Sequence, residues 1–381
     1  MKLLHVGDLH LGRSLGDFDL IADQEYILDQ ILGIIDKYSV DAILIAGDVW
    51  DRAVPSEAAT RLLDSFLTSL SNKGVKTYMI SGNHDSDDRL NYANAFFESR
   101  QVYIASVFDG SLKKYEADND VCVWLLPFVK ASQVRHFYED AKIETYEDAV
   151  RTVLEHTEID KDKCNILVAH QFVAENETDP VPGGSEGAGT LNVGTVEKIG
   201  YDCFDDFDYV ALGHIHSPQS VGRKEVRYSG SPLKYSLSEV NNSKSVPIIT
   251  VDKKDVNIEL VPLKPMRDMR HICGKLEELL DKGNIKSPED FIYATLTDED
   301  VINDAMGIIQ QTYPYTVKID YDNSHTREIE QVDIAGIAQN RSFTDLIGDF
   351  YRQVYGCEIS DEELTYMVMV AREAGVEVET D

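Results

Sequence analysis

Short apolar runs alternate with helical patterns along residues 2–80. The runs stand at 2–6, 42–46 and 75–80, and between them 24–38 and 56–72 carry apolar residues at helical spacing. This order predicts a βαβαβ unit with right-handed crossovers and an at least partly parallel sheet. Further apolar runs follow at 121–126, 165–169, 209–212 and 247–251. Their density predicts a second sheet. The Gly-, Pro- and acid-rich stretch 174–195 is expected to be a mobile surface loop.

The pattern changes near residue 264. Beyond it we expect an amphipathic helix over 267–281, then strands at 291–296 and 316–321 around another helix, which together predict a small α/β domain. The last forty or so residues predict two helices. The expected division is therefore 1–264, 265–335 and 336–381, with the helices of the last part at 342–355 and 361–374.

Composition indicates a soluble, cytoplasmic protein. Of 381 residues 43% are hydrophobic, and no apolar run approaches the ~20 residues of a membrane span. The N-terminus shows no secretory signal. The five cysteines are scattered without a C-x-x-C pair, which is typical of a reducing compartment.

The formal net charge of −32 bears on which substrates and partners the protein can bind. A protein that grips DNA by itself usually has a basic surface, so this charge favours a small-molecule enzyme or an acidic interaction protein. Two circumstances would reconcile it with DNA. Bound divalent cations would invert the local field, or a partner would supply most of the grip.

The candidate chemistry follows the predicted strands. Each of several strand ends is followed at once by metal-binding side chains, and the carboxyl ends of parallel strands meet at one edge of a sheet. Glycines before most of these groups would let the backbone turn sharply. The segments are Gly7-Asp8-Leu9-His10, Gly47-Asp48-Val49-Trp50-Asp51, Gly82-Asn83-His84-Asp85, Ala169-His170 and Gly213-His214-Ile215-His216.

The residue types indicate a two-metal site. Carboxylate, amide and imidazole ligands without thiolate suit Mn²⁺, Fe²⁺ or Zn²⁺. The side chains are too many for one ion, whereas two ions ~3.5–4 Å apart that share Asp48 accommodate them and can clamp a phosphoryl transfer. His84 is left to stabilise the transition state or to protonate the leaving oxygen. Asp51 and Asp85 either orient histidine ligands or serve simple turns.

Other histidines and a tryptophan near these motifs are assigned structural roles. We expect His5 to be buried and hydrogen-bonded within its strand, and Trp50 to pack in the core. Histidines 136, 156, 271 and 325 are expected on helices or loops without a catalytic role.

The order D-x-H, G-D-x-x-D, G-N-H-D, a lone His and G-H-x-H resembles the calcineurin-like metallophosphoesterases. Residues 10–12, 82–86, 213–219 and 228–233 make the chain similar to the SbcD-type branch, the Mre-type DNA repair nucleases. Residues 262–270 resemble the join to that branch's capping domain. The resemblance implies an α/β fold: a four-layer αββα sandwich of two mixed β-sheets, with a small α/β capping domain and C-terminal helices.

The resemblance also implies site roles and partners. One metal would be held by Asp8, His10, Asp48 and His216, and the other by Asp48, Asn83, His170 and His214, with His84 as the catalytic residue. The metal would be Mn²⁺. The enzyme would be a double-strand exonuclease and a single-strand and hairpin endonuclease in DNA repair, recombination and replication. It would work at the nucleoid as a homodimer, bound through its C-terminal helices to an SbcC-type ABC ATPase.

Two other functions stay open at this point. A metallophosphodiesterase for nucleotides or other small phosphodiesters would use the same metal site. A scaffold that only binds partners would have lost ligands, whereas every expected position is filled here. Because histidine ligands bind metal only when neutral, activity is expected to fall below about pH 6.5.

Overall fold

The computed structural model describes residues 1–175, 178–186, 198–324, 344, 347–348, 351–352 and 359–373. The chain divides into two units, which we treat separately. The first comprises 1–295 and 303–320, and the second comprises 296–302 and 321–381.

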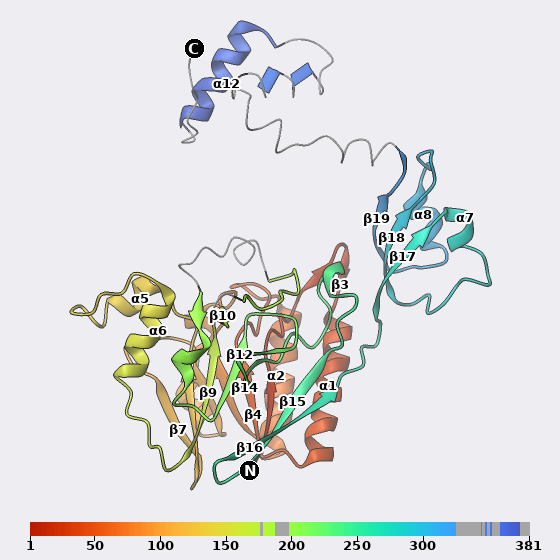
Figure 1. The fold of residues 1–381 in the computed structure, drawn as a ribbon. Coiled ribbons are helices and arrows are strands. Elements are labelled where there is room, and N and C mark those ends of the chain that lie inside the picture. Colours follow the sequence, from red (N-terminus) through yellow and green to blue (C-terminus); the bar gives the residue numbers. More distant parts are fainter. Residues whose placement is uncertain are drawn as a thin grey trace. The chain divides into compact units, whose positions relative to one another are not determined.

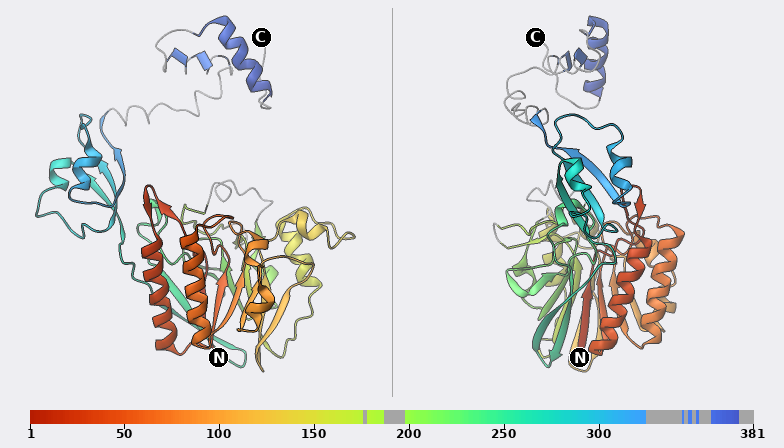
Figure 2. Two further views of the ribbon diagram at one scale, coloured as in Figure 1. Left: turned by 180° about the vertical axis from the view of Figure 1, so that it is seen from behind. Right: turned by 90° about the vertical axis from the view of Figure 1, so that its right-hand side faces the viewer.

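The first unit contains a six-stranded sheet built largely from the predicted βαβαβ segment (Figure 1). Its parallel strands are β1 (Lys2–Val6), β4 (Ala42–Ala46), β5 (Lys76–Ile80) and β6 (Val102–Ala105). The antiparallel strands β15 (Ser245–Asp252) and β16 (Asp255–Pro262) complete the edge beside β1. Helices α1 (Ile21–Tyr38) and α2 (Glu57–Asn72) cover its outer face, which confirms the predicted order of elements (Figure 2).

The predicted second sheet is also present and has six strands. Its strands, in spatial order, are β13 (Gln219–Val221), β14 (Arg223–Tyr228), β12 (Tyr209–Gly213), β9 (Cys164–His170), β8 (Val121–Leu126) and β7 (Lys113–Asp118). Strands β14, β12, β9 and β8 run parallel, and the two edge strands run antiparallel. Helices α5 (Ala131–Arg135) and α6 (Tyr146–Glu155) lie on the outer face.

The central strands are continuously apolar because both of their faces are buried. In β4, Ile43 and Ile45 face α1 and α2, whereas Ala42, Leu44 and Ala46 face the second sheet. The two sheets therefore pack on each other through one apolar cluster, and each packs on its helices through another. This arrangement confirms the four-layer αββα sandwich.

A small sheet of three strands follows, in the order β17 (Met269–Gly274), β18 (Phe291–Leu296) and β19 (Thr316–Tyr321). The two later strands and the helix between them, α8 (Ala305–Gln310), confirm the prediction. The helix expected over 267–281 is wrong. This stretch forms β17 and only one helical turn, α7 (Leu276–Leu279), so His271 lies on a strand. Pairing with β18 overrides the helical spacing of Met269 and Ile272.

Short elements complete the first unit: β2 (Ser14–Leu15), β3 (Phe18–Asp19), α3 (Asp87–Leu90), α4 (Asn94–Glu98), β10 (Val173–Ala174), β11 (Ile199–Gly200) and the 3₁₀ turns Tyr201–Phe204 and Leu237–Glu239. Of the predicted loop 174–195, residues 176–177 and 187–195 lie outside the described part. Its described residues are not all at the surface, because Ser185 and Glu186 are buried.

In the second unit, α12 (Asp361–Glu373) matches the helix expected at 361–374. A capping box starts it: the Glu363 N–H donates to Ser360 Oγ at 3.3 Å, and Glu363 accepts from the Ser360 N–H at 3.0 Å. Most of the helix expected at 342–355 lies outside the described residues. Among the helices that the structure describes, none has the length and apolar character needed to cross a membrane.

Candidate metal centre

The structure brings the predicted site segments together at the carboxyl ends of strands from both sheets. The Asp8 N–H donates to Gly47 O at 3.1 Å, and the His10 N–H donates to Asp48 O at 2.9 Å. Across the two sheets, the His214 N–H donates to Asp8 Oδ1 at 2.8 Å. Main-chain hydrogen bonds thus tie the loops after β1 and β4 together, and the Asp8 carboxylate ties them to the loop after β12.

The candidate ligand atoms form two groups with Asp48 between them. In the first, His10 Nε2 lies 3.5 Å from Asp48 Oδ2 and 3.1 Å from His216 Nε2. In the second, His170 Nε2 lies 3.4 Å from Asp48 Oδ2 and 3.1 Å from Asn83 Oδ1. The Asn83 oxygen lies in turn 3.0 Å from His214 Nδ1. All seven side chains predicted as ligands therefore meet at one place.

The donor set fits divalent cations. Oδ2 of Asp8 is buried and has no hydrogen-bond partner among the described residues, which is costly for a carboxylate unless a cation lies beside it. Burial raises the pKa of Asp8 to about 6. Two clusters have ligand atoms close enough to share an ion, and both include Asp8: one with His10 and His216, the other with Asp48 and His170.

Backbone strain is concentrated on the candidate ligands. Asp8, His10, Asp48 and His214 have positive φ angles of 54°, 42°, 47° and 101°. Such conformations cost roughly 1–3 kcal/mol each for non-glycine residues and cluster at functional sites. We expected the glycines before the ligands to take up the turns, and Gly47 does so with a φ of 79°. Gly213 and Gly82 instead provide space, because a Cβ there would lie 1.9 Å from Ala46 O and 2.1 Å from Asp48 Oδ1, respectively.

The electrostatics divide the histidines into two kinds. Burial lowers the pKa of His10 well below its usual value and that of His214 to about 3, so both are neutral and able to bind a metal. Burial by itself would also lower the pKa of His170. The carboxylates of Asp48 and Asp8 outweigh that effect and raise it to about 9. The pKa of Asp48 falls well below its usual value because the neighbouring His170 outweighs burial.

Further contacts orient the ligands. His170 Nδ1 lies 2.8 Å from Ala46 O, a bond that requires Nδ1–H and leaves Nε2 free to face Asp48. Asp85 accepts from the N–H groups of Val49, Trp50 and Gly82 at 2.9–3.1 Å, so it fastens the loops after β4 and β5 together. Asp51 Oδ1 lies 3.6 Å from His10 Nδ1.

His84 is half-buried at the edge of this group. Its N–H donates to Asp48 Oδ1 at 2.9 Å, and its Nδ1 lies 3.1 Å from Asp51 O. The ring centroids of His84 and His10 are 4.8 Å apart. The carbonyl partner requires Nδ1–H, so Nε2 is the nitrogen left for other contacts.

The structural roles expected for His5 and Trp50 are confirmed. His5 is fully buried, with Nδ1 3.0 Å from Tyr209 Oη, and Trp50 is part of the core cluster. Sequence reasoning missed other residues at the site, namely Ser185, Glu186, Glu239 and Lys244. Ser185 and Glu186 stand in the stretch expected to be a surface loop, and no motif marks Glu239 or Lys244.

Comparison with known proteins agrees with this geometry. The family model described as calcineurin-like phosphoesterase matches residues 1–218, and that described as type 5 capsule protein repressor C-terminal domain matches residues 265–355. The chain therefore belongs to the calcineurin-like phosphoesterase family, a family of metal-dependent hydrolases.

Among its relatives is the SbcD subunit of the nuclease SbcCD of Staphylococcus epidermidis. The two sequences are 34% identical over 362 residues, which is 93% of this chain and 93% of that protein. The similarity spans both matched domains, so the resemblance to SbcD-type proteins is confirmed.

Two solved structures are also similar. They are TT1561 of Thermus thermophilus (TM-score 0.39, 12% identity, 68% of this chain and 98% of that chain) and a dimetal phosphatase from Danio rerio (TM-score 0.40, 9% identity, 70% and 98%). Because both TM-scores are below 0.5, family membership rests on the sequence matches.

Proposed function

We propose that this chain is a two-metal-ion DNA nuclease that cuts double-stranded ends as an exonuclease and single strands or hairpins as an endonuclease. The convergence of carboxylate, amide and imidazole ligands around the unpartnered Oδ2 of Asp8 carries the metal-dependent chemistry. The likeness to a relative named as a nuclease, along 93% of the chain, supports DNA as the substrate.

In this proposal Asp8, His10, Asp48 and His216 hold one ion, and Asp48, Asn83, His170 and His214 hold the other. The position of Asp48 Oδ2, within 3.5 Å of His10 and 3.4 Å of His170, supports its role as the shared ligand. When bound, a pair of Mn²⁺ ions supplies an acidified water and neutralises charge on the phosphate.

The catalytic role falls to His84. Its Nδ1 is engaged with Asp51 O at 3.1 Å, which fixes the ring with Nε2 available to a substrate. When Nε2 also carries a proton, it can donate a hydrogen bond to a phosphate oxygen or transfer that proton to the leaving oxygen. Asp51 thereby acts as a positioning residue for His84 through its carbonyl and lies near His10 through its carboxylate. Asp85 positions the Asp48 loop.

We also propose that residues 1–264 form the nuclease domain, 265–335 a DNA-binding cap and 336–381 the segment that binds an SbcC-type ATPase. On α12, Tyr366, Met367, Met369 and Val370 are 40–63% exposed, and such an apolar surface suits a protein partner. The complex would act in the cytoplasm, at the nucleoid, in DNA repair, recombination and replication, with the nuclease as a homodimer.

Digestion of labelled linear double-stranded and hairpin DNA tests the proposal. With Mn²⁺, wild-type protein is expected to cut both, and His84→Gln to cut neither. The SbcC-type partner is added in a parallel reaction, because a net charge of −32 weakens the grip of the isolated chain on DNA. Absence of cutting in every reaction would refute the nuclease assignment.

The same charge favours a second candidate, hydrolysis of a small phosphodiester at this site. Bis-p-nitrophenyl phosphate offered beside DNA distinguishes the two. Cleavage of the small substrate alone, with the partner present, would make the chain a small-molecule phosphodiesterase.

A further inference from the structure

A buried ion pair lies directly behind the candidate ligand His216. Glu239 is 0% and Lys244 5% exposed, and the Lys244 ammonium donates to Glu239 Oε2. A buried ion pair is weak evidence for stability, because both charges lose their hydration. Its other partners therefore indicate what it does.

The pair is connected to the His216 ring through a serine hydroxyl. Ser185 Oγ lies 2.6 Å from His216 Nδ1 and 2.6 Å from Glu239 Oε1. The Glu239 carboxylate accepts from the Lys244 ammonium, the Tyr235 N–H and the Ser185 hydroxyl. The carboxylate therefore accepts throughout and needs no proton of its own.

This pattern decides where the hydrogen atoms lie. Ser185 has a single hydroxyl hydrogen, and it points to Glu239. Its oxygen can then only accept from His216, so His216 carries its proton on Nδ1. The lone pair of Nε2 consequently faces the His10 side of the site, 3.1 Å from His10 Nε2.

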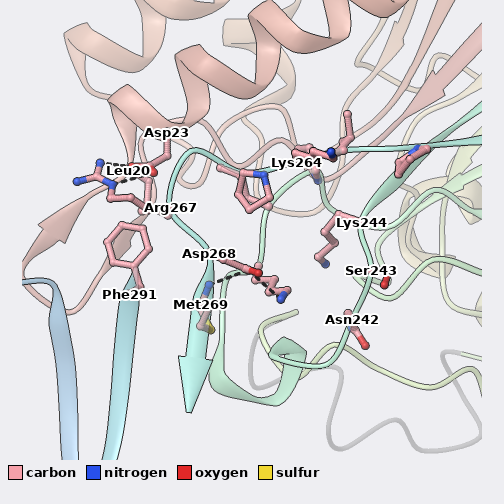
Figure 3. A pocket seen from close by; sticks show the side chains of 16 residues that line it. Leu20, Asp23, Asn242, Ser243, Lys244, Lys264, Arg267, Asp268, Met269 and Phe291 are labelled. Carbon is pink, nitrogen blue, oxygen red and sulfur yellow. Dashed lines mark hydrogen bonds and ion pairs between the residues drawn. The ribbon is translucent and has the colours of Figure 1, made fainter. Parts of the chain in front are cut away.

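Lys244 and Glu186 hold the main chain of His216. The Lys244 ammonium donates to His216 O at 2.9 Å, and the His216 N–H donates to Glu186 Oε1 at 3.0 Å. The main chain of Lys244 is also held in place, because the Leu263 N–H donates to Lys244 O at 2.9 Å. Figure 3 shows Lys244 on the wall of a pocket there, beside Lys264 and Asp268.

We propose that Ser185, Glu239 and Lys244 form a buried positioning chain that fixes the Nδ1–H tautomer of His216 and presents its Nε2 to a metal ion. The inference rests on the proposed function for the identity of the ion as one of the catalytic pair. Ser185, Glu239 and Lys244 touch neither substrate nor metal in this scheme. They act only through His216.

The first test measures Mn²⁺ affinity by electron paramagnetic resonance of the free ion. Ser185→Ala is expected to weaken one of the two sites by about 10- to 100-fold, the range found when a hydrogen-bond partner of a histidine ligand is removed. Ser185→Thr keeps the hydroxyl and should restore binding. Ser238→Ala is the matched control, since the Ser238 hydroxyl bonds Gly183 O rather than His216. Unaltered Mn²⁺ affinity in Ser185→Ala would contradict the proposed positioning chain, provided that all variants melt at similar temperatures.

The second test needs no metal. In protein with ¹⁵N-labelled histidine, the two-bond couplings of His216, assigned by comparison with His216→Gln, should report Nδ1–H in the wild type and a mixture in Ser185→Ala. An Nε2–H tautomer in the wild type would overturn the inference. If wild-type protein bound no Mn²⁺, the proposed two-metal function would fail, while the tautomer would still decide the positioning chain by itself.

Discussion

The loops after β1, β4 and β5 hold their site residues through one another, whereas those after β9 and β12 depend on distant segments. The first half of the site consists of the loops after β1, β4 and β5. In it, Asp85 accepts hydrogen bonds from two N–H groups of the loop after β4 and from one N–H group of its own loop. In the second half, His170 is oriented by Ala46 O and His216 by Ser185 Oγ, from elsewhere in the chain.

This difference explains why one half is easier to read from sequence. Adjacent parallel strands place their loops side by side, so the support of one motif stands in the next motif: Asp85 of Gly82-Asn83-His84-Asp85 holds the loop that carries Asp48. The supports of the second half, Ala46 and Ser185, stand outside the metal-binding motifs. Their motifs show the ligands without the residues that hold them.

The largest effect is expected from replacing Asp48, whose carboxylate lies between His10 of the first half and His170 of the second. Asp48→Ala should abolish Mn²⁺ binding at both sites and lower kcat/KM by about 1,000-fold or more, because metal stabilisation of the transition state is worth several kcal/mol. Metal analysis and DNA cleavage check this, with the exposed Asp64→Ala as control. A variant that keeps one fully occupied site would show that Asp48 is not shared.

The next largest effect should be confined to the first half. His84→Gln is expected to lower kcat by about 100- to 10,000-fold, the usual contribution of a general acid or a comparable group, while both metals stay bound. Turnover and metal content are measured on the same sample. Metal loss in this variant would make His84 a ligand.

A stability measurement tests the local support of the first half. Asp85→Ala leaves three buried N–H groups without their acceptor and should lower the free energy of unfolding by roughly 2–4 kcal/mol. Burial raises the pKa of Asp85 to about 7, so below that pH the folded protein holds a proton that the unfolded chain releases, and the wild type should gain stability as the pH falls through 7. Urea unfolding at pH 8 compares it with the exposed Asp88→Ala. Equal stability of the two variants would contradict the clamp.

The smallest effect concerns the proton of His170, in the second half of the site, which consists of the loops after β9 and β12. In the metal-free protein His170 keeps its proton up to a pKa of about 9 and must lose it to bind a metal. Apparent Mn²⁺ affinity should therefore fall by up to about tenfold for each pH unit below 9, and more steeply below the pKa of Asp8, about 6. Calorimetry in buffers of different ionisation enthalpy measures the proton released. No release at pH 7.5 would mean that His170 is already neutral.

That pH window lies higher than the sequence alone predicted. From the ordinary pKa of histidine we expected activity to decline below about pH 6.5. Two carboxylates beside His170 move its pKa upward, and only the fold places them there.

Most of the αββα core and the identity of the converging side chains could be predicted from the amino-acid sequence. Strands β1, β4 and β8 coincide with their predicted bounds, because strands buried on both faces are made mostly of apolar residues. The order of the strands then brings the ends of β1, β4, β5, β9 and β12 together, and with them the candidate ligands.

The other features of the fold and the site depend on contacts between segments that are far apart in the sequence. Along β17 burial is partial, so the apolar spacing at 267–281 favoured a helix until pairing with β18 made it a strand. The positive φ angles of Asp8 and Asp48, the close approach of Gly213 to Ala46 O and the contact of Ser185 with His216 also have no local signal. Long-range packing can enforce conformations and contacts that neighbouring residues alone do not favour.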